Sequence, residues 1–280
     1  MMLAAFAIKY STLGYLIYLT MGAYTVAFVL GGLSLLFTKD KTKTCPAYIL
    51  ANMFFAAGFC LATATFVYRW TETGTTPFQN LFEVFLSLMV LIWPISVISK
   101  RFFGIRGQTL DMLIGALLCV MPGFIRSADI SPLRPAMQTT LFVPHVGFYM
   151  LGTILMAKAT VQAIGVLITG NSCRDKLLHY ERSTYGLVSI AFPPMTTGLV
   201  LGCIWAKLAW GDFWSWDPKE QWSLATWLAF IGYFHLRFVF GGRRHPRTCA
   251  AAAIICMVLI LITLLWANLS SIFAGIHSYA

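Results

Sequence analysis

Eight hydrophobic runs, each close to the length that crosses a bilayer, constrain the fold of this chain more than any other feature. One helix needs about 20 apolar residues to span the hydrocarbon core. Only 11% of the residues are charged, against about 25% in an average soluble domain. The runs cover residues 13–37, 46–68, 80–99, 108–124, 139–168, 185–206, 221–240 and 248–270. The sequence therefore predicts an all-α, polytopic integral membrane protein with about eight transmembrane helices, forming a single integral membrane domain over residues 1–280.

The basic residues between the runs predict the orientation. Twelve lie in the first, third, fifth and seventh linkers, and five lie in the second, fourth and sixth, which hold Arg69, Arg126, Arg134, Lys207 and Lys219. Cytoplasmic loops carry the excess of Lys and Arg, so we expect the odd linkers in the cytoplasm and both termini on the outer side. The first run is far longer than the apolar core of a signal peptide, so we expect an uncleaved first span.

Charge and cysteine content exclude several classes of function. The net charge of +10 is mostly a topological signal, because no linker is long enough to form a basic nucleic-acid-binding domain. The seven cysteines form no C-x-x-C and no C-x-x-C-H. A thioredoxin-like redox couple and a c-type haem attached to this chain are therefore not expected.

A tryptophan-rich segment, residues 205–227, carries six of the nine tryptophans. One or two tryptophans at a membrane boundary are ordinary interface anchors. Six within 23 residues, on the predicted outer side, favour a stacking platform for a large planar aromatic ligand. Within this segment Asp217, Pro218 and Glu220 match an N-cap, a proline at the first helical position and a capping-box glutamate. We predict that they start the seventh helix.

Two histidines fall on the same predicted side as the tryptophan-rich segment. His145 opens the fifth run in LFVPHVGF, and His277 lies in the C-terminal tail in FAGIHSYA. Either one alone is more simply explained as an interfacial imidazole bonded to the backbone. Together, beside an aromatic surface, they favour a bis-imidazole haem site, because imidazole is a standard axial ligand of haem iron. By contrast, we expect His179 and His245, which lie in cytoplasmic linkers, to be solvated.

His235 is the one deep histidine. It lies fourteen residues after Gln221, or roughly 21 Å along a helix, which places it in the inner half of the bilayer. An ionisable residue at that depth is a functional candidate. The alternative is a neutral imidazole bonded to a neighbouring helix. The roles of the charged residues near the outer boundary also have alternatives. The five basic residues of the even linkers could pair with haem propionates or be solvated. The partner of Glu83 is not apparent from the sequence.

Four segments together resemble a known family. Trp210–Glu220, WGDFWSWDPKE, is similar to the WWD signature of haem-handling proteins in cytochrome c maturation. Pro77–Glu83 before a span, Pro144-His145 at a span start and Gly275–Ala280 at the C-terminus resemble the CcsA (ResC) type of the system II pathway. The resemblance covers the chain from about residue 70 to the end.

The resemblance implies a function, a cofactor and partners. The chain would be the membrane subunit of a system II cytochrome c synthase, part of a haem ligase acting with a CcsB (ResB)-type membrane subunit. It would deliver haem b and present it on the outer face for thioether attachment to the C-x-x-C-H motif of apocytochrome c. The membrane would be the cytoplasmic (inner) membrane with a periplasmic active face, or a thylakoid with a lumenal one. The residues expected to bind or frame haem are His145, His277, His235, Trp205, Trp210, Trp214, Trp216, Asp217 and Trp222.

Three other functions remain open at this point. A haem exporter without ligase activity would have the same haem site. A b-type membrane electron carrier usually has pairs of histidines within its spans, and only His235 is deep. A regulatory protein of haem supply is the third.

Overall fold

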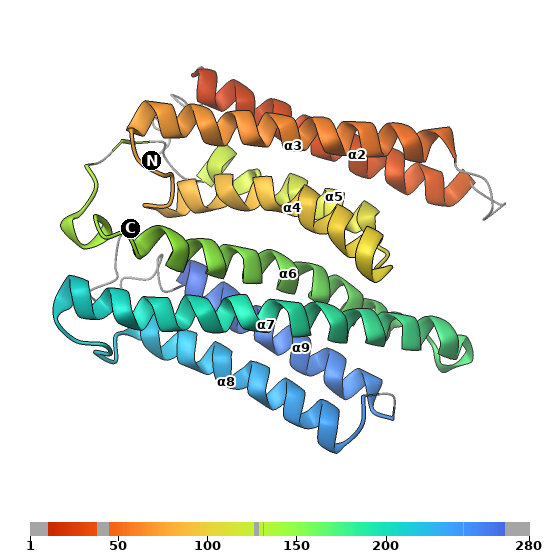
Figure 1. The fold of residues 1–280 in the computed structure, drawn as a ribbon. Helices are drawn as coiled ribbons and strands as arrows, with labels where there is room; N and C mark the ends of the chain where they lie inside the picture. The colour runs from red at the N-terminus through yellow and green to blue at the C-terminus, as the bar shows by residue number, and fades with distance from the viewer. Residues whose placement is uncertain (1–10, 38–44, 126–128, 131, 243, 267–280) are drawn as a thin grey trace. The chain divides into compact units, whose positions relative to one another are not determined.

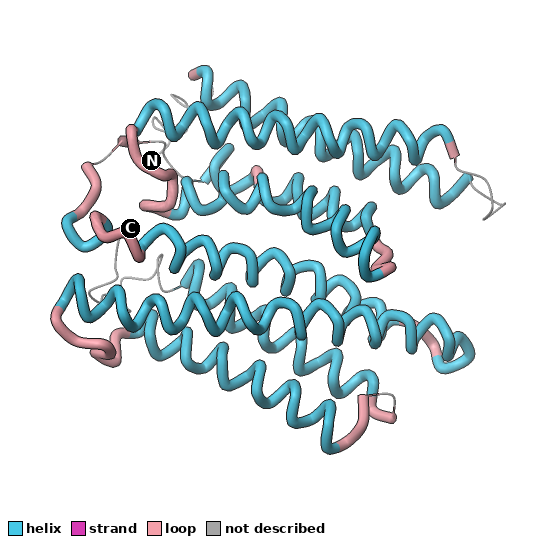
Figure 2. The backbone as a smooth tube through the Cα atoms, in the orientation of Figure 1, coloured by secondary structure: helices cyan, strands magenta, loops and turns pink. Residues whose placement is uncertain are grey.

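The structure is a computed structural model, and it describes residues 11–37, 45–125, 129–130, 132–242 and 244–266. Within these ranges every regular element is a helix, as Figure 2 shows, which confirms the all-α prediction. The elements are α2 (Thr12–Phe37), α3 (Pro46–Thr73), α4 (Leu81–Phe103), α5 (Gln108–Leu118), η1 (Met121–Ile125), η2 (Pro135–Met137), α6 (Phe142–Ile168), η3 (Asn171–Cys173), α7 (Arg174–Trp210), α8 (Pro218–Val239), α9 (Pro246–Leu261) and η4 (Ile262–Trp266).

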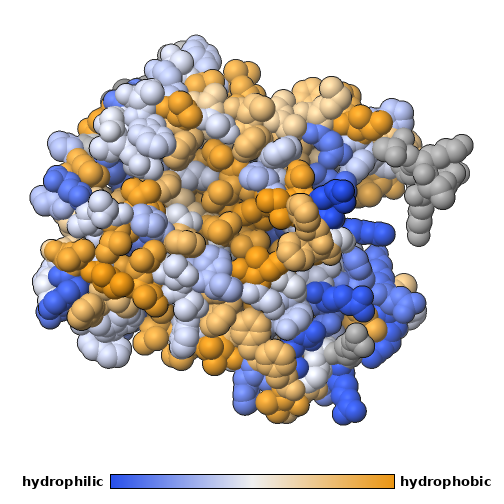
Figure 3. All heavy atoms as spheres, viewed as in Figure 1, coloured by the Kyte–Doolittle hydropathy of each residue, from blue (hydrophilic) through white to orange (hydrophobic). Residues whose placement is uncertain are grey.

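Each predicted hydrophobic run overlaps one of the α-helices, and two runs continue into η1 and η4. Residues 267–270 of the last run lie outside the described residues. Six helical stretches are long and apolar enough to cross a membrane: α2, α3, α4, α6, α7 and Pro246–Leu265. Many large apolar side chains on these helices are exposed, and Figure 3 shows them as orange surface. Such a surface suits lipid, so the chain is a multi-pass membrane protein. Gln108–Phe124 is a shorter apolar stretch, and α8 has 22 residues with charges near both ends; spanning by these two stays a prediction.

The helices form two compact units, one up to Pro132 and one from Leu133 (Figure 1). Whether both belong to a single membrane domain stays a prediction. In the first unit, Tyr24 of α2 is fully buried and its hydroxyl donates to the Met89 carbonyl oxygen at 2.8 Å. Its ring occupies the space left by Gly58 of α3 and Gly115 of α5, where an added methyl would clash with it. Through this one side chain, α2 contacts α3, α4 and α5.

Arg69 and Glu83 form a buried ion pair in the first unit. Each is only 1% exposed, and the Arg69 Nε donates to Glu83 Oε1 at 3.1 Å. Arg69 also pairs with the exposed Glu72 at 3.1 Å and donates to the Asp129 carbonyl oxygen. The Glu83 carboxylate accepts the Gln79 backbone N–H at 2.9 Å, which closes the loop before α4. Arg69 is therefore neither solvated nor in a linker, because α3 continues past it to Thr73.

α7 is longer than its predicted run. It begins at Arg174, so residues 174–184, which we expected as a linker, form its first turns. No glycine or proline interrupts this stretch, and Leu177 and Glu181 bury one face of it. His179, expected in a solvated linker, is half-buried on this helix. The 37 residues extend about 55 Å. Pro193 and Pro194 lie within α7 and remove two backbone donors from its hydrogen-bond ladder.

In the second unit, α6 and α7 pack along each other with glycines facing large side chains in both directions. Gly198 and Gly202 of α7 face Tyr149 and His145 of α6. In return, Gly152 and Gly165 of α6 face Met195 and Tyr180 of α7. α9 packs against both α6 and α8. At the far end of α8, Arg237 pairs with Glu181 of α7 and lies 4.0 Å from the centre of the Tyr185 ring.

We expect Glu83→Gln to destabilise the protein strongly, because it leaves the buried Arg69 guanidinium without its main counter-charge. Breaking a buried ion pair costs about 3–5 kcal/mol. The control is Glu72→Gln, which removes a more exposed partner and should cost about 1 kcal/mol or less. Thermal unfolding of the two purified variants in detergent measures the difference. Equal losses would contradict the assignment of Glu83 as the main partner.

Candidate functional site

The described residues include eight of the nine residues predicted to bind or frame haem. His277 lies outside the described residues, so its pairing with His145 stays a prediction. Of the other eight, His145, Trp205 and Trp210 come together at the end of the second unit where α6 begins and α7 ends. Trp214, Trp216 and Asp217 lie in the loop between α7 and α8, Trp222 lies in the first turns of α8, and His235 lies near the other end of α8.

The His145 ring is fixed on three sides. Its Nδ1 lies 2.8 Å from the Gly198 carbonyl oxygen. The ring stacks on Trp205 with centroids 5.5 Å apart and planes 24° apart, and the edge of Tyr149 meets it at 5.2 Å. Because a carbonyl oxygen only accepts, Nδ1 carries the proton and Nε2 keeps its lone pair. Metal-ligating histidines are oriented by the same kind of bond.

Glycine at position 202 makes this placement possible. A methyl group added there would lie 2.6 Å from His145 Cε1 and 2.9 Å from Nδ1, closer than any real contact. One turn earlier, a methyl on Gly198 would meet the Tyr149 ring at 3.0 Å. Gly198 and Gly202 form a G-x-x-x-G pattern, which lets membrane helices approach closely. This pattern is visible in the sequence, but it is not among the motifs from which the site was predicted.

The tryptophans of the segment differ in their surroundings. Trp205 is 2% exposed, donates from Nε1 to the Ala136 carbonyl oxygen at 2.8 Å and touches Trp210 edge-on at 4.7 Å. It therefore supports the His145 ring from within the fold. Trp216 is 65% exposed and meets Trp214 edge-on at 6.0 Å. A stacking platform made by all of them stays a prediction.

The predicted start of α8 is confirmed. The Asp217 side chain accepts the Lys219 backbone N–H at 3.0 Å, and Asp217 and Glu220 form a complete capping box around Pro218. At the other side of the loop, Gly211 ends α7 with φ of 94°. Lys207 Nζ donates to the Gly211 carbonyl oxygen at 2.5 Å, so this predicted linker charge caps the end of α7.

The loop also holds one strained residue. Trp216 has φ of 59°, the only positive φ of a non-glycine residue among those described. The left-handed region costs a residue with a Cβ atom about 1–2 kcal/mol. Such strain is retained where the surrounding structure enforces it, and often at functional sites.

Lys219 lies beside the capping carboxylate, just before the seventh predicted run. Burial lowers the pKa of its ammonium to about 8, and the charge of Asp217 acts in the opposite direction. An anionic group placed near Lys219 would favour its charged form. This environment is compatible with the propionate-pairing alternative and does not suit a fully solvated lysine.

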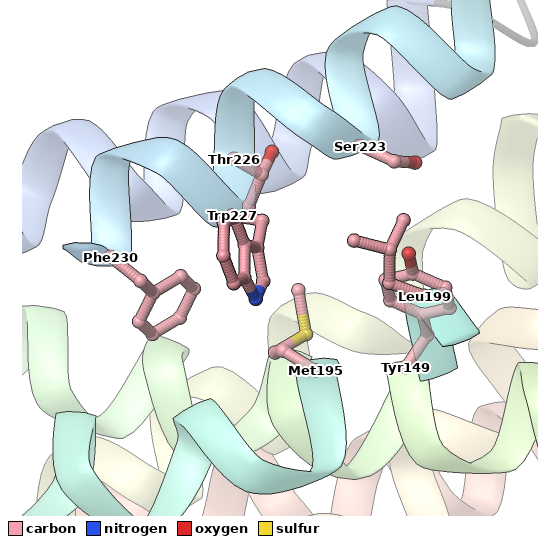
Figure 4. A pocket seen from close by; sticks show the side chains of 7 residues that line it. All are labelled: Tyr149, Met195, Leu199, Ser223, Thr226, Trp227 and Phe230. Atoms are coloured by element: carbon pink, nitrogen blue, oxygen red, sulfur yellow. The ribbon is translucent and has the colours of Figure 1, made fainter. Parts of the chain in front are cut away.

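A crevice opens one turn beyond His145 between α6, α7 and α8 (Figure 4). The space between its lining side chains, part of which is open to solvent, is about 170 Å³. Its lining residues are Tyr149, Met195, Leu199, Ser223, Thr226, Trp227 and Phe230.

His235 lies on the exposed face of α8, one turn before its end at Val239. Among the described residues it makes no hydrogen bond or ring contact, so the alternative of an imidazole bonded to a neighbouring helix is not seen in this part of the chain. Leu228, Ile231 and Phe238 share its exposed face. Gly232, three residues before it, has open space where a side chain would be.

Comparison with known proteins identifies the family. The model of the family described as "Cytochrome C assembly protein" matches residues 26–274, which is most of the chain. This chain belongs to the cytochrome c assembly protein family.

Relatives of this cytochrome c assembly protein are of the CcsA type, which confirms the resemblance. Cytochrome c biogenesis protein CcsA of Cyanophora paradoxa is 29% identical over 268 residues, covering 75% of this chain and 81% of the relative. CcsA of Prochlorococcus marinus (strain MIT 9303) is 30% identical over 264 residues, covering 78% and 80%. CcsA of Synechococcus sp. (strain CC9311) is 27% identical and covers 93% of this chain and 97% of the relative.

The fold is similar to that of a larger solved protein. The cytochrome c heme lyase CcmF superposes with a TM-score of 0.66 at 19% identity, over 90% of this chain. This cytochrome c assembly protein spans 46% of the length of that structure. At such low identity the likeness concerns the fold alone.

We expect Gly202→Ala to displace the His145 ring, because the added methyl would occupy its position. Overpacking of this kind costs about 1–3 kcal/mol, and it should reduce bound haem more than it reduces the folded fraction. Gly186→Ala is the matched control, since this α7 glycine has open space at its Cβ position. The haem-to-protein ratio of the purified variants measures the effect, and equal ratios would contradict the role of Gly202.

Proposed function

We propose that this chain is the membrane subunit of a system II cytochrome c synthase. It receives haem b as substrate, holds it on the outer face of the membrane and presents it to the C-x-x-C-H motif of an apocytochrome c. The observation that carries the proposal is the oriented imidazole of His145, whose Nδ1 contacts the Gly198 carbonyl oxygen and whose Nε2 lone pair is available to iron. Membership of the cytochrome c assembly family supports it.

Each residue of the proposed site has a defined part. His145 and His277 are the axial ligands of the outer haem. Trp205 supports the His145 ring, and Trp210, Trp214, Trp216 and Trp222 frame the macrocycle. Asp217 fixes the angle at which the loop enters α8.

The proposed reaction is thioether formation. Each cysteine S–H adds across a haem vinyl C=C bond: sulfur bonds to the carbon next to the ring, and the hydrogen goes to the outer carbon. Electrons and atoms balance without an oxidant. Holding haem and peptide in one geometry makes this addition effectively intramolecular, which is a large part of the catalysis that such a site can supply.

The second part of the proposal concerns the membrane interior and the partner. His235 lies on an exposed, apolar face of α8. If it binds the iron of a haem there, the second ligand of that iron comes from another polypeptide. We assign that ligand to a CcsB-type membrane subunit. The membrane is the bacterial inner membrane or a thylakoid, with the outer site on the periplasmic or lumenal side.

We expect His145→Ala to abolish covalent haem attachment to a co-expressed reporter cytochrome c, since the iron loses an oriented ligand. Added imidazole should restore part of the product by filling the empty coordination position, and His179→Ala should behave as wild type. Haem staining of the denatured reporter measures attachment. Wild-type staining in His145→Ala would contradict the ligand assignment. A wild-type complex that carries haem but never labels the reporter would instead identify a haem exporter.

We expect His235→Ala to remove an inner haem from the complex with a CcsB-type subunit while leaving the outer haem in place. The chain alone should show at most the outer haem. Leu228→Ala on the same face of α8 is the control, since it changes the surface without removing a ligand. Absorption spectra and haem content of the purified complexes measure both haems. Two fully ligated haems in the isolated chain would contradict the assignment.

A further inference from the structure

Trp216 combines two properties that rarely occur together. Its side chain is 65% exposed, and its backbone adopts φ of 59°. Its one ring contact among the described residues is the edge-on pair with Trp214. A bulky residue in the left-handed region is an outlier, and the little packing that Trp216 makes within the protein does not account for it.

The neighbouring polar groups enforce this conformation. The Glu220 carboxylate accepts the backbone N–H groups on both sides of Trp216, from Ser215 at 2.8 Å and from Asp217 at 3.2 Å. Gln221 Nε2 donates to the Trp216 carbonyl oxygen at 2.5 Å. Glu220 is buried, so its carboxylate depends on these donors. Hydrogen bonds therefore fix the backbone of Trp216 itself and of the residues on either side of it.

Helix capping explains only part of this arrangement. A capping box requires the bond from the Asp217 N–H to Glu220 and the bond from the α8 backbone to Asp217. The bonds from Ser215, through its N–H at 2.8 Å and its hydroxyl at 3.2 Å, are additional. They fix the residue before Trp216, which lies outside the cap.

We propose that Glu220 is a positioning residue that holds Trp216 in the left-handed conformation, so that its indole stands out of the loop and stacks on the planar tetrapyrrole. This inference rests on the proposed haem-binding function and assigns within it a role to a carboxylate that never touches haem. The strain is offset by the hydrogen bonds of Glu220 and Gln221. The exposed indole contributes only when a flat apolar ligand covers it.

The first test replaces Trp216 by glycine, which adopts a positive φ without strain. Trp216→Gly should raise the thermal midpoint of the haem-free full chain in detergent. It should also weaken binding of added haemin roughly two- to tenfold, the factor expected for one aromatic stacking contact. Binding is followed by the Soret absorption band. A lower midpoint together with unchanged haemin affinity would overturn the proposal, because Trp216 would then be structural.

The second test asks whether Glu220 acts through Trp216. Glu220→Ala should weaken haemin binding in the wild-type background and have little further effect in the Trp216→Gly background. Glu220→Gln, whose amide oxygen can still accept one N–H and keep the capping box, should retain more affinity than Glu220→Ala. If Glu220 only caps α8, its loss will weaken binding equally in both backgrounds, and the positioning role is wrong.

The proposed function and the positioning role fail separately. If the wild-type chain binds no haemin, either alone in detergent or in the complex with a CcsB-type subunit, the proposed function is wrong and the positioning role is wrong with it. A wild-type chain that binds haemin while the two Glu220→Ala effects are equal would reject only the positioning role of Glu220.

Discussion

The contact between the His145 ring and the bare backbone of α7 determines how the rest of the candidate site is arranged. The ring can lie against α7 because Gly198 and Gly202 carry no side chains, and its Nδ1 reaches the Gly198 carbonyl oxygen for the same reason. Trp205 then supports the ring face and Tyr149 its edge. In a membrane, helices gain little from excluding water, so close packing of small against large residues is a main source of association. The same contact that joins α6 to α7 therefore also orients the candidate ligand.

The sequence predicted the helices and some of their ends, but not their facing surfaces. Apolar runs locate spans because the bilayer requires length and hydrophobicity, and Asp217-Pro218 with Glu220 located the start of α8 because capping is local chemistry. Runs that are apolar all round carry no signal about which face packs. The insertion of Tyr24 between Gly58 and Gly115 could therefore not be derived. Nor could the φ of Trp216, which results from hydrogen bonds made by residues later in the chain.

The partners and the burial of charged residues were the features that the sequence predicted least well. Arg69 and Glu83 look like boundary charges in the sequence, yet the structure buries them as a pair. Glu181 and Arg237 likewise meet across α7 and α8, from residues 56 positions apart. An ion pair in a low-dielectric setting forms between whichever opposite charges the fold brings together. Counts of linker charges therefore do not reveal the role of an individual charged residue.

The paired prolines of α7 give this long helix a property that its regular neighbours lack. Pro193 and Pro194 lie between the segment that carries Glu181 and the segment that carries Gly198 and Gly202. Two backbone donors are missing there, so the hydrogen-bond ladder of α7 is weakest at this point, and the helix would bend there more easily than elsewhere. Bending there would change how closely Gly198 and Gly202 approach the helix that carries His145. Glu181, in the other segment, would stay paired with α8. Such bending would change the position of His145, the candidate ligand, without unfolding any helix.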